Sequence, residues 1–155
     1  MSEILNRDVL LANLMRNVPY VAFMGFEFSA DGEALAAKMP YRPNLIGNPA
    51  LPALHGGAIA SFLEMTAFMT LGWSRIWMGD GGISAQGEVW PSIPKTIDLT
   101  VDYMRSGKPQ ETFASARITR AGRRFATVHA TAWQEDRDRP IADAMCHFLM
   151  PRCDG

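Results

Sequence analysis

Cysteines, long apolar runs and an excess of charge are scarce or missing in this sequence, and each absence excludes a class of protein. The two cysteines, Cys146 and Cys153, form neither a disulfide framework nor a metal-binding pair, which favours a reducing, cytoplasmic location. No stretch approaches the roughly 18 consecutive apolar residues of a membrane span. Charged residues such as Glu3, Arg7 and Asp8 interrupt the N-terminal segment, which is untypical of a signal peptide. We therefore expect a cytoplasmic protein without a membrane partner.

The charge balance argues against a nucleic-acid partner. The formal net charge is −1, and charged residues make up 20% of a chain that is 48% hydrophobic. No basic face of the kind that binds phosphate backbones is implied. The sequence shows no internal repeat, and its 155 residues predict one globular domain, 1–155.

The N-terminal half predicts helices and a hairpin. Residues 3–17 carry an irregular apolar stripe typical of a helix that Pro19 ends. Asp31-Gly32 is a strong turn signal between two short strands. A loop rich in Pro and Asn follows at 42–54. Residues 56–73 are apolar on nearly all sides, which predicts a buried helix, although Glu64 stands inside it.

The C-terminal half predicts strands. After an irregular, lid-like segment at 74–94, apolar and polar residues alternate at 96–104, so that Thr96 and Asp98 face away from Ile97 and Leu99. Further strands are predicted at 111–120, 123–135 and 140–150. Alanines line one face of the 123–135 strand and of its neighbour, which allows close approach of another element.

These elements predict an α+β fold. A helix that is apolar on all sides needs a curved antiparallel sheet to wrap it. We therefore expect a curved sheet around one central helix, with an extra N-terminal helix over residues 1–19 and a core over 24–150.

The two glycines that open the predicted central helix suggest a chemistry. The first N–H groups of a helix lack partners within it and carry the positive end of its dipole. Without side chains, Gly56 and Gly57 leave these donors open to a ligand, and donors of this kind stabilise a developing oxyanion.

Glu64 lies too far along the same helix to serve those donors. It follows Gly57 by seven residues, or roughly 10 Å. It can reach the corresponding donors of a second, antiparallel copy, which predicts a composite site at a two-fold interface. The alternative is a partly buried acid paired with an arginine.

At this point the sequence resembles a known family. "HGGAIASFLE", the strand "TIDLTVDYMRSG" and the hairpin "RITRAGRRFATVHATAW" are similar to hot-dog-fold acyl-CoA thioesterases of the phenylacetic acid degradation type. The similarity runs from about residue 24 to residue 150. It implies hydrolysis of a medium-chain or aryl acyl-CoA, with coenzyme A as part of the substrate and no other cofactor. It also implies a homodimer with joined sheets, often paired into a homotetramer.

The resemblance also implies roles for single residues. Glu64 is the general base or the nucleophile, and Gly57 is the preferred backbone donor. His55 contacts the thioester carbonyl or orients the loop; the alternative is a helix-capping histidine. Asn48 helps to position substrate and water, although the loop before His55 is longer than usual by one residue, with Asn44 as a weaker substitute; the alternative for Asn48 is a turn-forming residue before Pro49. Thr96 supports the acid or its water, unless it is an ordinary strand residue.

A second group of residues is assigned to substrate binding. Arginine and lysine pair well with the phosphates of coenzyme A, and apolar residues on the central helix would line an acyl pocket unless they belong to the core. The assigned residues are Gly56, Met65, Phe68, Arg105, Lys108, Arg123 and Arg124. We predict no metal site, since His129 and His147 lie on separate strands without a ligand pattern.

Two other functions stay open at the level of sequence. One is a hot-dog dehydratase or hydratase that acts on hydroxyacyl or enoyl thioesters. The other is a module that binds acyl thioesters without catalysis.

Overall fold

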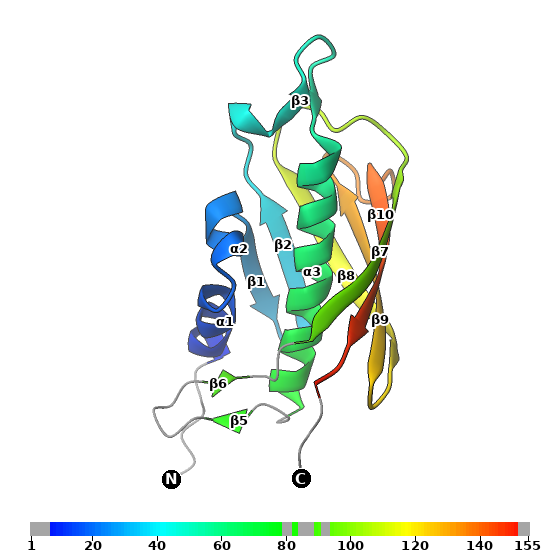
Figure 1. Ribbon diagram of the computed structural model, residues 1–155. Helices are drawn as coiled ribbons and strands as arrows, with labels where there is room; N and C mark the ends of the chain where they lie inside the picture. Colours follow the sequence, from blue (N-terminus) through cyan, green and yellow to red (C-terminus); the bar gives the residue numbers. More distant parts are fainter. Residues whose placement is uncertain (1–6, 79–81, 84–88, 91–93, 152–155) are drawn as a thin grey trace.

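A curved antiparallel sheet wraps one long helix in the computed structural model, which describes residues 7–78, 82–83, 89–90 and 94–151 (Figure 1). The six strands of this sheet stand in the order β1-β2-β8-β9-β10-β7. Their bounds are Glu27–Asp31 (β1), Ala34–Met39 (β2), Lys95–Tyr103 (β7), Thr112–Ala121 (β8), Phe125–Trp133 (β9) and Ala142–Leu149 (β10). The helices are α1 (Arg7–Arg16), α2 (Pro19–Met24) and α3 (Gly56–Trp77). This is the hot-dog arrangement that the resemblance implies.

Small side chains on the sheet let α3 lie close against it. Ala130 and Ala132 on β9 and Ala142 on β10 are fully buried beneath the helix, as are Phe62 and Leu63 on the helix itself. Short alanine side chains leave room for the larger helical ones, so the two layers can pack closely. The predicted helix and the predicted alanine face are therefore confirmed, and α3 extends four residues beyond its predicted end.

The chain enters this core through two helices where the sequence predicts one. Pro19, predicted to end the first helix, instead opens α2, because proline is well tolerated in the first turn of a helix. α2 ends at Gly25, which adopts the left-handed conformation with φ 70°. The helix predicted over 3–17 is confirmed as α1 within the described residues, and its first residues, up to residue 6, lie outside them. The second helix, α2, was not predicted.

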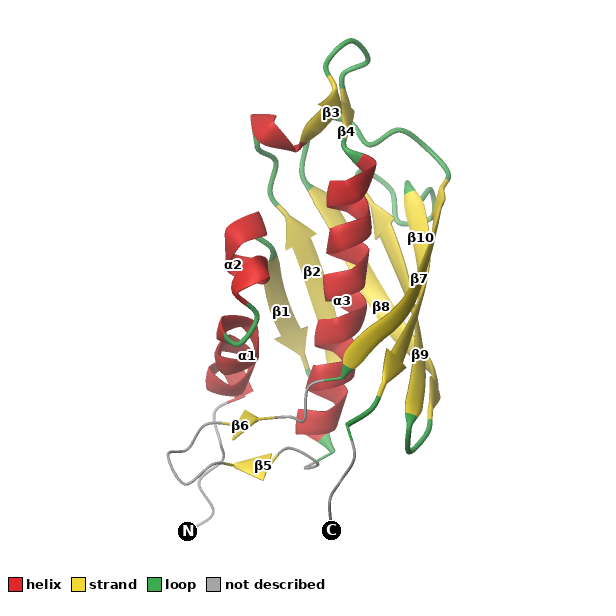
Figure 2. Ribbon diagram, viewed as in Figure 1, coloured by secondary structure: helices red, strands yellow, loops and turns green. Residues whose placement is uncertain are grey.

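The predicted loop at 42–54 is more ordered than expected. It contains a short 3-10 helix, η1 (Pro43–Leu45), and a small hairpin of β3 (Ile46–Asn48) and β4 (Ala53–Leu54). The hairpin projects beyond the N-terminus of α3 (Figure 2). The prediction of an irregular loop was wrong here because short strands of two or three residues carry too little alternation to be recognised.

The segment 74–94 divides into three parts. Its first residues continue α3 to Trp77, and the two short strands β5 (Gly82–Ile83) and β6 (Val89–Trp90) pair with each other. The lid-like connection that the sequence predicts falls mostly on residues outside the described part.

The edge strand β7 contains an irregularity that changes which way one candidate residue faces. In the pairing of β7 with β10, His147 stands opposite Asp98 but Phe148 stands opposite Thr96, which leaves Ile97 in a β-bulge. Because directly opposed residues share a face, Thr96 lies on the helix side with buried Phe148. The predicted alternation, which put Thr96 on the face of Asp98, was wrong at this position.

The β7 edge also exposes apolar side chains. Ile97 is 54% exposed and Tyr103 is 53% exposed. An edge strand with exposed apolar residues and unpaired backbone groups is a ready site for pairing with another strand. None of the helices in the described ranges is long and apolar enough to cross a membrane.

Candidate active site

His55 caps the N-terminus of α3 and uses several of its free donors. The Gly57 N–H donates to His55 Nδ1 at 2.8 Å. The N–H groups of Ala58 and Ile59 donate to the His55 carbonyl oxygen at 3.0 and 3.2 Å. In the part of the chain that the structure describes, the Gly56 N–H has no recorded partner. The open donor of this helix is therefore that of Gly56, whereas the Gly57 donor preferred from the sequence is occupied by the His55 ring.

Glu64 lies on the open side of the same helix. Two turns separate it from Gly57, so both face the same way, and both retain solvent exposure in this chain. No arginine or lysine lies within 4 Å of its carboxylate among the described residues, so the alternative of a paired acid finds no partner in the chain itself. The roughly 10 Å between the two positions keeps Glu64 away from the donors of its own helix.

A buried thiol lies on the sheet beneath Glu64. Burial, together with the negative charges of Glu64 and Asp98, raises the pKa of Cys146 to about 12. Cys146 stands opposite Leu99 of β7 in the sheet. Glu64 therefore lies near enough to Cys146, on the strand next to β7, for the two groups to interact electrostatically.

A cavity of about 300 Å³ adjoins the His55 cap. Tyr20 and Phe23 of α2 form one wall, and Asn44 of η1 lines it together with His55 and Gly57. Asn48, the preferred asparagine of the sequence analysis, instead accepts a hydrogen bond from the Ala50 N–H at 3.0 Å in the β3–β4 turn. The structure thus brings Asn44, and not Asn48, to the cavity.

Two apolar candidates on α3 belong mainly to the core. Phe68 is 7% exposed and packs against Phe148 with ring centroids 6.4 Å apart. Met65 is half-buried and packs against the same core. Neither lines the cavity beside His55. Sequence reasoning missed Tyr20 and Phe23, which precede the region of family resemblance.

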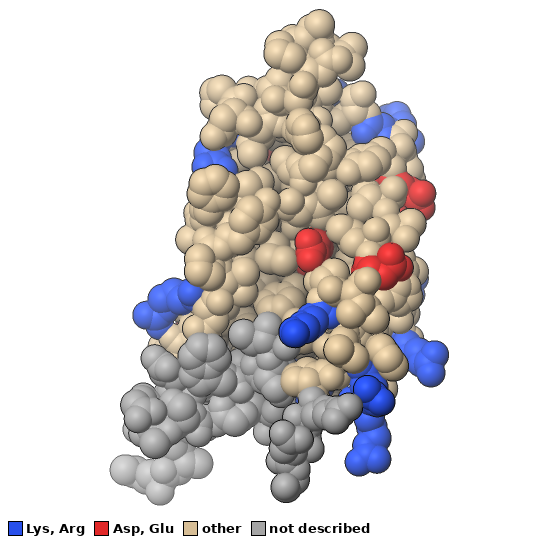
Figure 3. Space-filling model, in the orientation of Figure 1, with Lys and Arg blue, Asp and Glu red and all other residues tan. Residues whose placement is uncertain are grey.

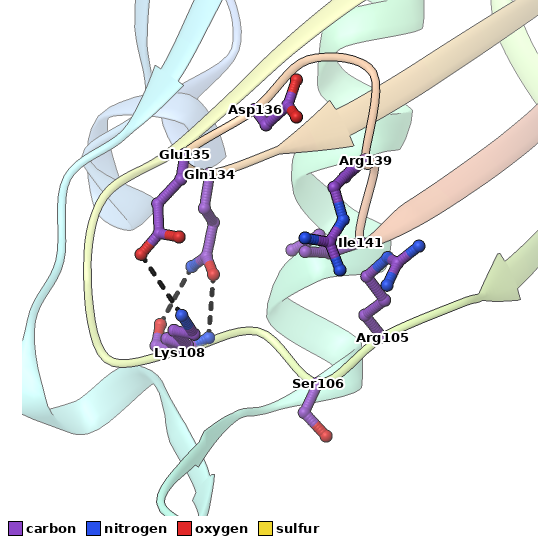
Figure 4. A pocket seen from close by; sticks show the side chains of 8 residues that line it. All are labelled: Arg105, Ser106, Lys108, Gln134, Glu135, Asp136, Arg139 and Ile141. Carbon is purple, nitrogen blue, oxygen red and sulfur yellow. Dashed lines mark hydrogen bonds and ion pairs between the residues drawn. The ribbon is translucent and has the colours of Figure 1, made fainter.

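A second cavity, of about 260 Å³, collects basic residues near the ends of β7 and β9 (Figure 4). Lys108 pairs with Glu135 at 3.2 Å, and the hydrogen bond from Lys108 lowers the pKa of that carboxyl. Arg105 and Arg139 also line the cavity, and within the described ranges neither has a carboxylate within 4 Å. Sequence reasoning missed Arg139, which follows Arg105 by 34 residues but lies beside it.

Arg123 and Arg124 do not join this cluster. They lie in the turn between β8 and β9, while Arg105 and Lys108 lie in the connection between β7 and β8. The ten residues of β8 separate the two groups by about 33 Å. Figure 1 shows the β8–β9 turn at the end of the molecule opposite the N-terminus of α3.

The remaining histidines lie on the outer face of the sheet. His129 approaches Asp143 at 3.7 Å, and His147 approaches Asp98 at 3.8 Å. The described residues contain no group of three or more side chains arranged to hold a metal ion.

The face that carries α3 is mostly uncharged. Figure 3 shows uncharged side chains over most of this view, with isolated acidic groups near its centre and right side and scattered basic groups, mostly towards its edges. An apolar or neutral surface beside an open strand edge suits contact with another protein chain better than contact with a nucleic acid.

Comparison with known proteins gives the family. The thioesterase superfamily model matches residues 51–141, more than half of the chain. The medium/long-chain acyl-CoA thioesterase YigI of Salmonella typhimurium is 29% identical over 86% of both chains. A crystal structure from Chromobacterium violaceum is 36% identical and covers 96% of this chain and 95% of its own, with a TM-score of 0.64.

The fold is shared more widely than the sequence. The Escherichia coli PaaI protein from the phenylacetic acid degradation operon has a TM-score of 0.71 at 12% identity, covering 94% of this chain and 93% of its own. With the family model across the helix and strands described above, this protein belongs to the thioesterase superfamily and is a thioester hydrolase with the hot-dog fold.

Proposed function

We propose that the protein hydrolyses acyl-coenzyme A thioesters to a carboxylic acid and free coenzyme A. The observation that carries this proposal is the free Gly56 N–H at the N-terminus of α3, with Glu64, which has no basic partner among the described residues, about two turns further along the same helix. A thioester carbonyl under attack needs a donor for its oxygen and a base or nucleophile at its carbon. The names of its YigI relatives support acyl-CoA as the substrate.

The site is proposed to be shared between two chains. Strand β7 lies at the edge of the sheet, with exposed apolar side chains. Antiparallel pairing of two β7 strands would set the two α3 helices side by side in opposite directions. Glu64 of one subunit would then approach the Gly56 donor of the other, and the two-fold symmetry would create two equal sites. Pairing of such dimers into a tetramer is a further part of the proposal.

The proposed chemistry uses the Gly56 N–H, Glu64 and water, and the His55 cap belongs to the same half of the site as the Gly56 donor. In one route Glu64 takes a proton from water while the water oxygen bonds to the thioester carbon, and the Gly56 N–H stabilises the oxyanion. Collapse then breaks the C–S bond, and the thiolate takes the proton from Glu64. In the other route the Glu64 carboxylate attacks the carbon itself, coenzyme A leaves, and water cleaves the resulting anhydride. Both routes need the same geometry, with Thr96 close to the acid.

The substrate would lie across the two cavities. Arg105 and Arg139, both without a carboxylate partner among the described residues, suit the phosphates of coenzyme A, while Lys108 is already paired. The aromatic wall of Tyr20 and Phe23 suits a medium-chain or aryl acyl group. Because coenzyme A thioesters are made and used in the cytoplasm, this substrate also agrees with the cytoplasmic location that we propose.

Glu64→Gln tests the function directly. The variant keeps the size and polarity of the side chain but loses the base, so thiol release from a panel of acyl-CoAs should fall by at least about 100-fold. Glu33→Gln, a change to an exposed acid on the β1–β2 turn, serves as the matched control and should retain wild-type turnover. Wild-type turnover by Glu64→Gln would contradict the assignment.

The same panel separates the rival functions. A dehydratase or hydratase would change the absorbance of an enoyl thioester without releasing thiol. A binding module would bind acyl-CoA saturably with no thiol released at all.

A further inference from the structure

The ring of His55 is held in a slot that two glycines create. A Cβ on Gly47 would lie 2.7 Å from His55 Cα and 2.9 Å from Cδ2. A Cβ on Gly57 would lie 2.9 Å from Nδ1 and 3.0 Å from Cε1. Real Cβ atoms do not approach other atoms this closely, so side chains at these positions would displace the ring. The two glycines therefore face the ring at Cδ2 on one side and at Nδ1 and Cε1 on the other.

The hydrogen bond inside the slot defines where the neutral ring carries its proton. Because the Gly57 N–H donates to Nδ1, this nitrogen must be an unprotonated acceptor. A neutral imidazole has one N–H, so the proton lies on Nε2. Nε2 has no recorded partner among the residues described, and the exposed His55 side chain borders the cavity proposed for the acyl group.

Tyr103 holds the peptide group that makes this bond. Its hydroxyl donates to the Gly56 carbonyl oxygen at 2.7 Å. Its ring lies so close to Gly56 that a Cβ there would be 3.3 Å from both the hydroxyl oxygen and Cζ. The Gly56 carbonyl and the Gly57 N–H belong to one planar peptide group. This group is therefore bonded at its oxygen to Tyr103 and at its nitrogen to His55.

We propose that Tyr103 is a positioning residue that, through the Gly56–Gly57 peptide, orients His55 as an Nε2–H donor to the thioester oxygen. The identity of the substrate rests on the proposed function, whereas the arrangement of Tyr103, the peptide group and His55 does not. The oxyanion would then receive two donors, the Gly56 N–H and His55 Nε2–H. A hydrogen bond to the peptide oxygen also polarises the N–H at its other end, which strengthens the bond to Nδ1. Tyr103 lies on β7, so the proposed interface strand and the catalytic cap are directly connected.

The tautomer can be measured without any activity. Long-range ¹⁵N–¹H correlation spectra of ¹⁵N-histidine-labelled protein distinguish protonated from unprotonated ring nitrogens, and a His55→Ala variant assigns the signal among three histidines. At a pH where the ring is neutral, we expect Nδ1 unprotonated and Nε2 protonated. A proton on Nδ1 of neutral His55 would overturn the proposal.

Tyr103→Phe tests the positioning role. The variant keeps the ring against Gly56 and loses only the hydroxyl, so kcat should fall about tenfold while KM for acyl-CoA changes less than about twofold. The Nε2–H tautomer of His55 should lose its dominance in the same spectra. Tyr41→Phe, at an exposed tyrosine with no recorded hydrogen bond in the described structure, is the matched control and should behave as the wild type. A wild-type kcat or an unchanged tautomer in Tyr103→Phe would overturn the role of Tyr103.

Failure of this inference differs from failure of the proposed function. If the wild-type protein releases no thiol from any acyl-CoA, the function is wrong whatever the spectra show. If thiol release is normal and depends on Glu64, but His55 carries its proton on Nδ1, the function stands and the inference is wrong.

Discussion

Glu64 and Cys146 are neighbouring ionisable residues with different roles: the acid is proposed for catalysis, and the thiol belongs to the core. The acid is half-buried and free of basic partners in the described chain, whereas the thiol beneath it is fully buried. Burial and the negative charges of Glu64 and Asp98 together raise the pKa of Cys146 from an ordinary 9.0 to about 12. The thiol therefore stays neutral at any pH at which the enzyme would work, and it adds no second nucleophile to the site.

The raised pKa of Cys146 predicts a dependence of stability on pH. Above pH 9 the thiol of the unfolded chain loses its proton first, so the stability present below pH 9 declines as the pH rises towards 12. The decline due to this group reaches at most about 1.4 kcal/mol per pH unit. Urea unfolding of the wild type and of Cys146→Ala between pH 8 and 10.5 measures it. Parallel curves for the two proteins would contradict the prediction.

At the residue scale the sequence identified candidate residues, but not how the structure arranges them. The HGG motif and Glu64 were recognisable because a glycine pair before an apolar helix, and one acid within it, are unusual. The choice between Gly56 and Gly57 was not accessible, since it depends on which way the His55 ring turns. The contributions of Arg139 and Tyr103 were equally hidden, because they reach the site from strands and loops distant in sequence.

The short helix α2 illustrates what one element adds to the hot-dog core. Tyr20 and Phe23 stack with ring centroids 6.1 Å apart, and the Tyr20 hydroxyl donates to Ser61 Oγ of α3 at 3.0 Å. Phe23 is nevertheless 72% exposed on the wall of the cavity. A large aromatic ring in this position suits contact with an apolar ligand.

Phe23→Ala should change the preference for acyl chain length. The variant removes apolar wall from the cavity, so kcat/KM for medium-chain acyl-CoA should fall about five- to tenfold, while that for acetyl-CoA should change little. Leu51→Ala, at a residue 66% exposed on the β3–β4 turn, is the control and should leave the profile unchanged. Equal losses on short and medium chains would show that α2 does not contact the acyl group.

At the element scale, long periodic segments were predictable and short ones were not. α3 and the strands β7 to β10 lie within a few residues of their predicted positions because their patterns extend over eight or more residues. α2 was missed because Pro19 is equally consistent with the end of one helix and the start of another. The β-bulge at Ile97 was missed because it depends on the partner strand, and it reverses the predicted direction of Thr96.

On the scale of the whole molecule, β7 ends the sheet with exposed apolar side chains that nothing in the single chain covers among the described residues. Ile97 is 54% exposed there, at the β-bulge of this strand. Ile97→Lys should prevent dimer formation, and turnover should fall in proportion to the fraction of dimer that is lost. The circular dichroism spectrum of the folded chain should stay unchanged. Val9→Lys changes a residue that is 50% exposed on α1 and should leave a wild-type dimer. Sedimentation analysis reports both results, and a fully active Ile97→Lys monomer would contradict the shared site.

The shared site requires Glu64 of one chain to lie beside the N-terminal cap of α3 in the other chain. Mixed dimers test this requirement most directly. Glu64→Gln and His55→Ala each remove one half of the site, so both homodimers should be nearly inactive. After denaturation and refolding of an equal mixture, half of the dimers contain both variants, and each of these has one intact site. Thiol release should recover to about one quarter of the wild-type value. No recovery, with mixed dimers shown to be present, would contradict a site shared between subunits.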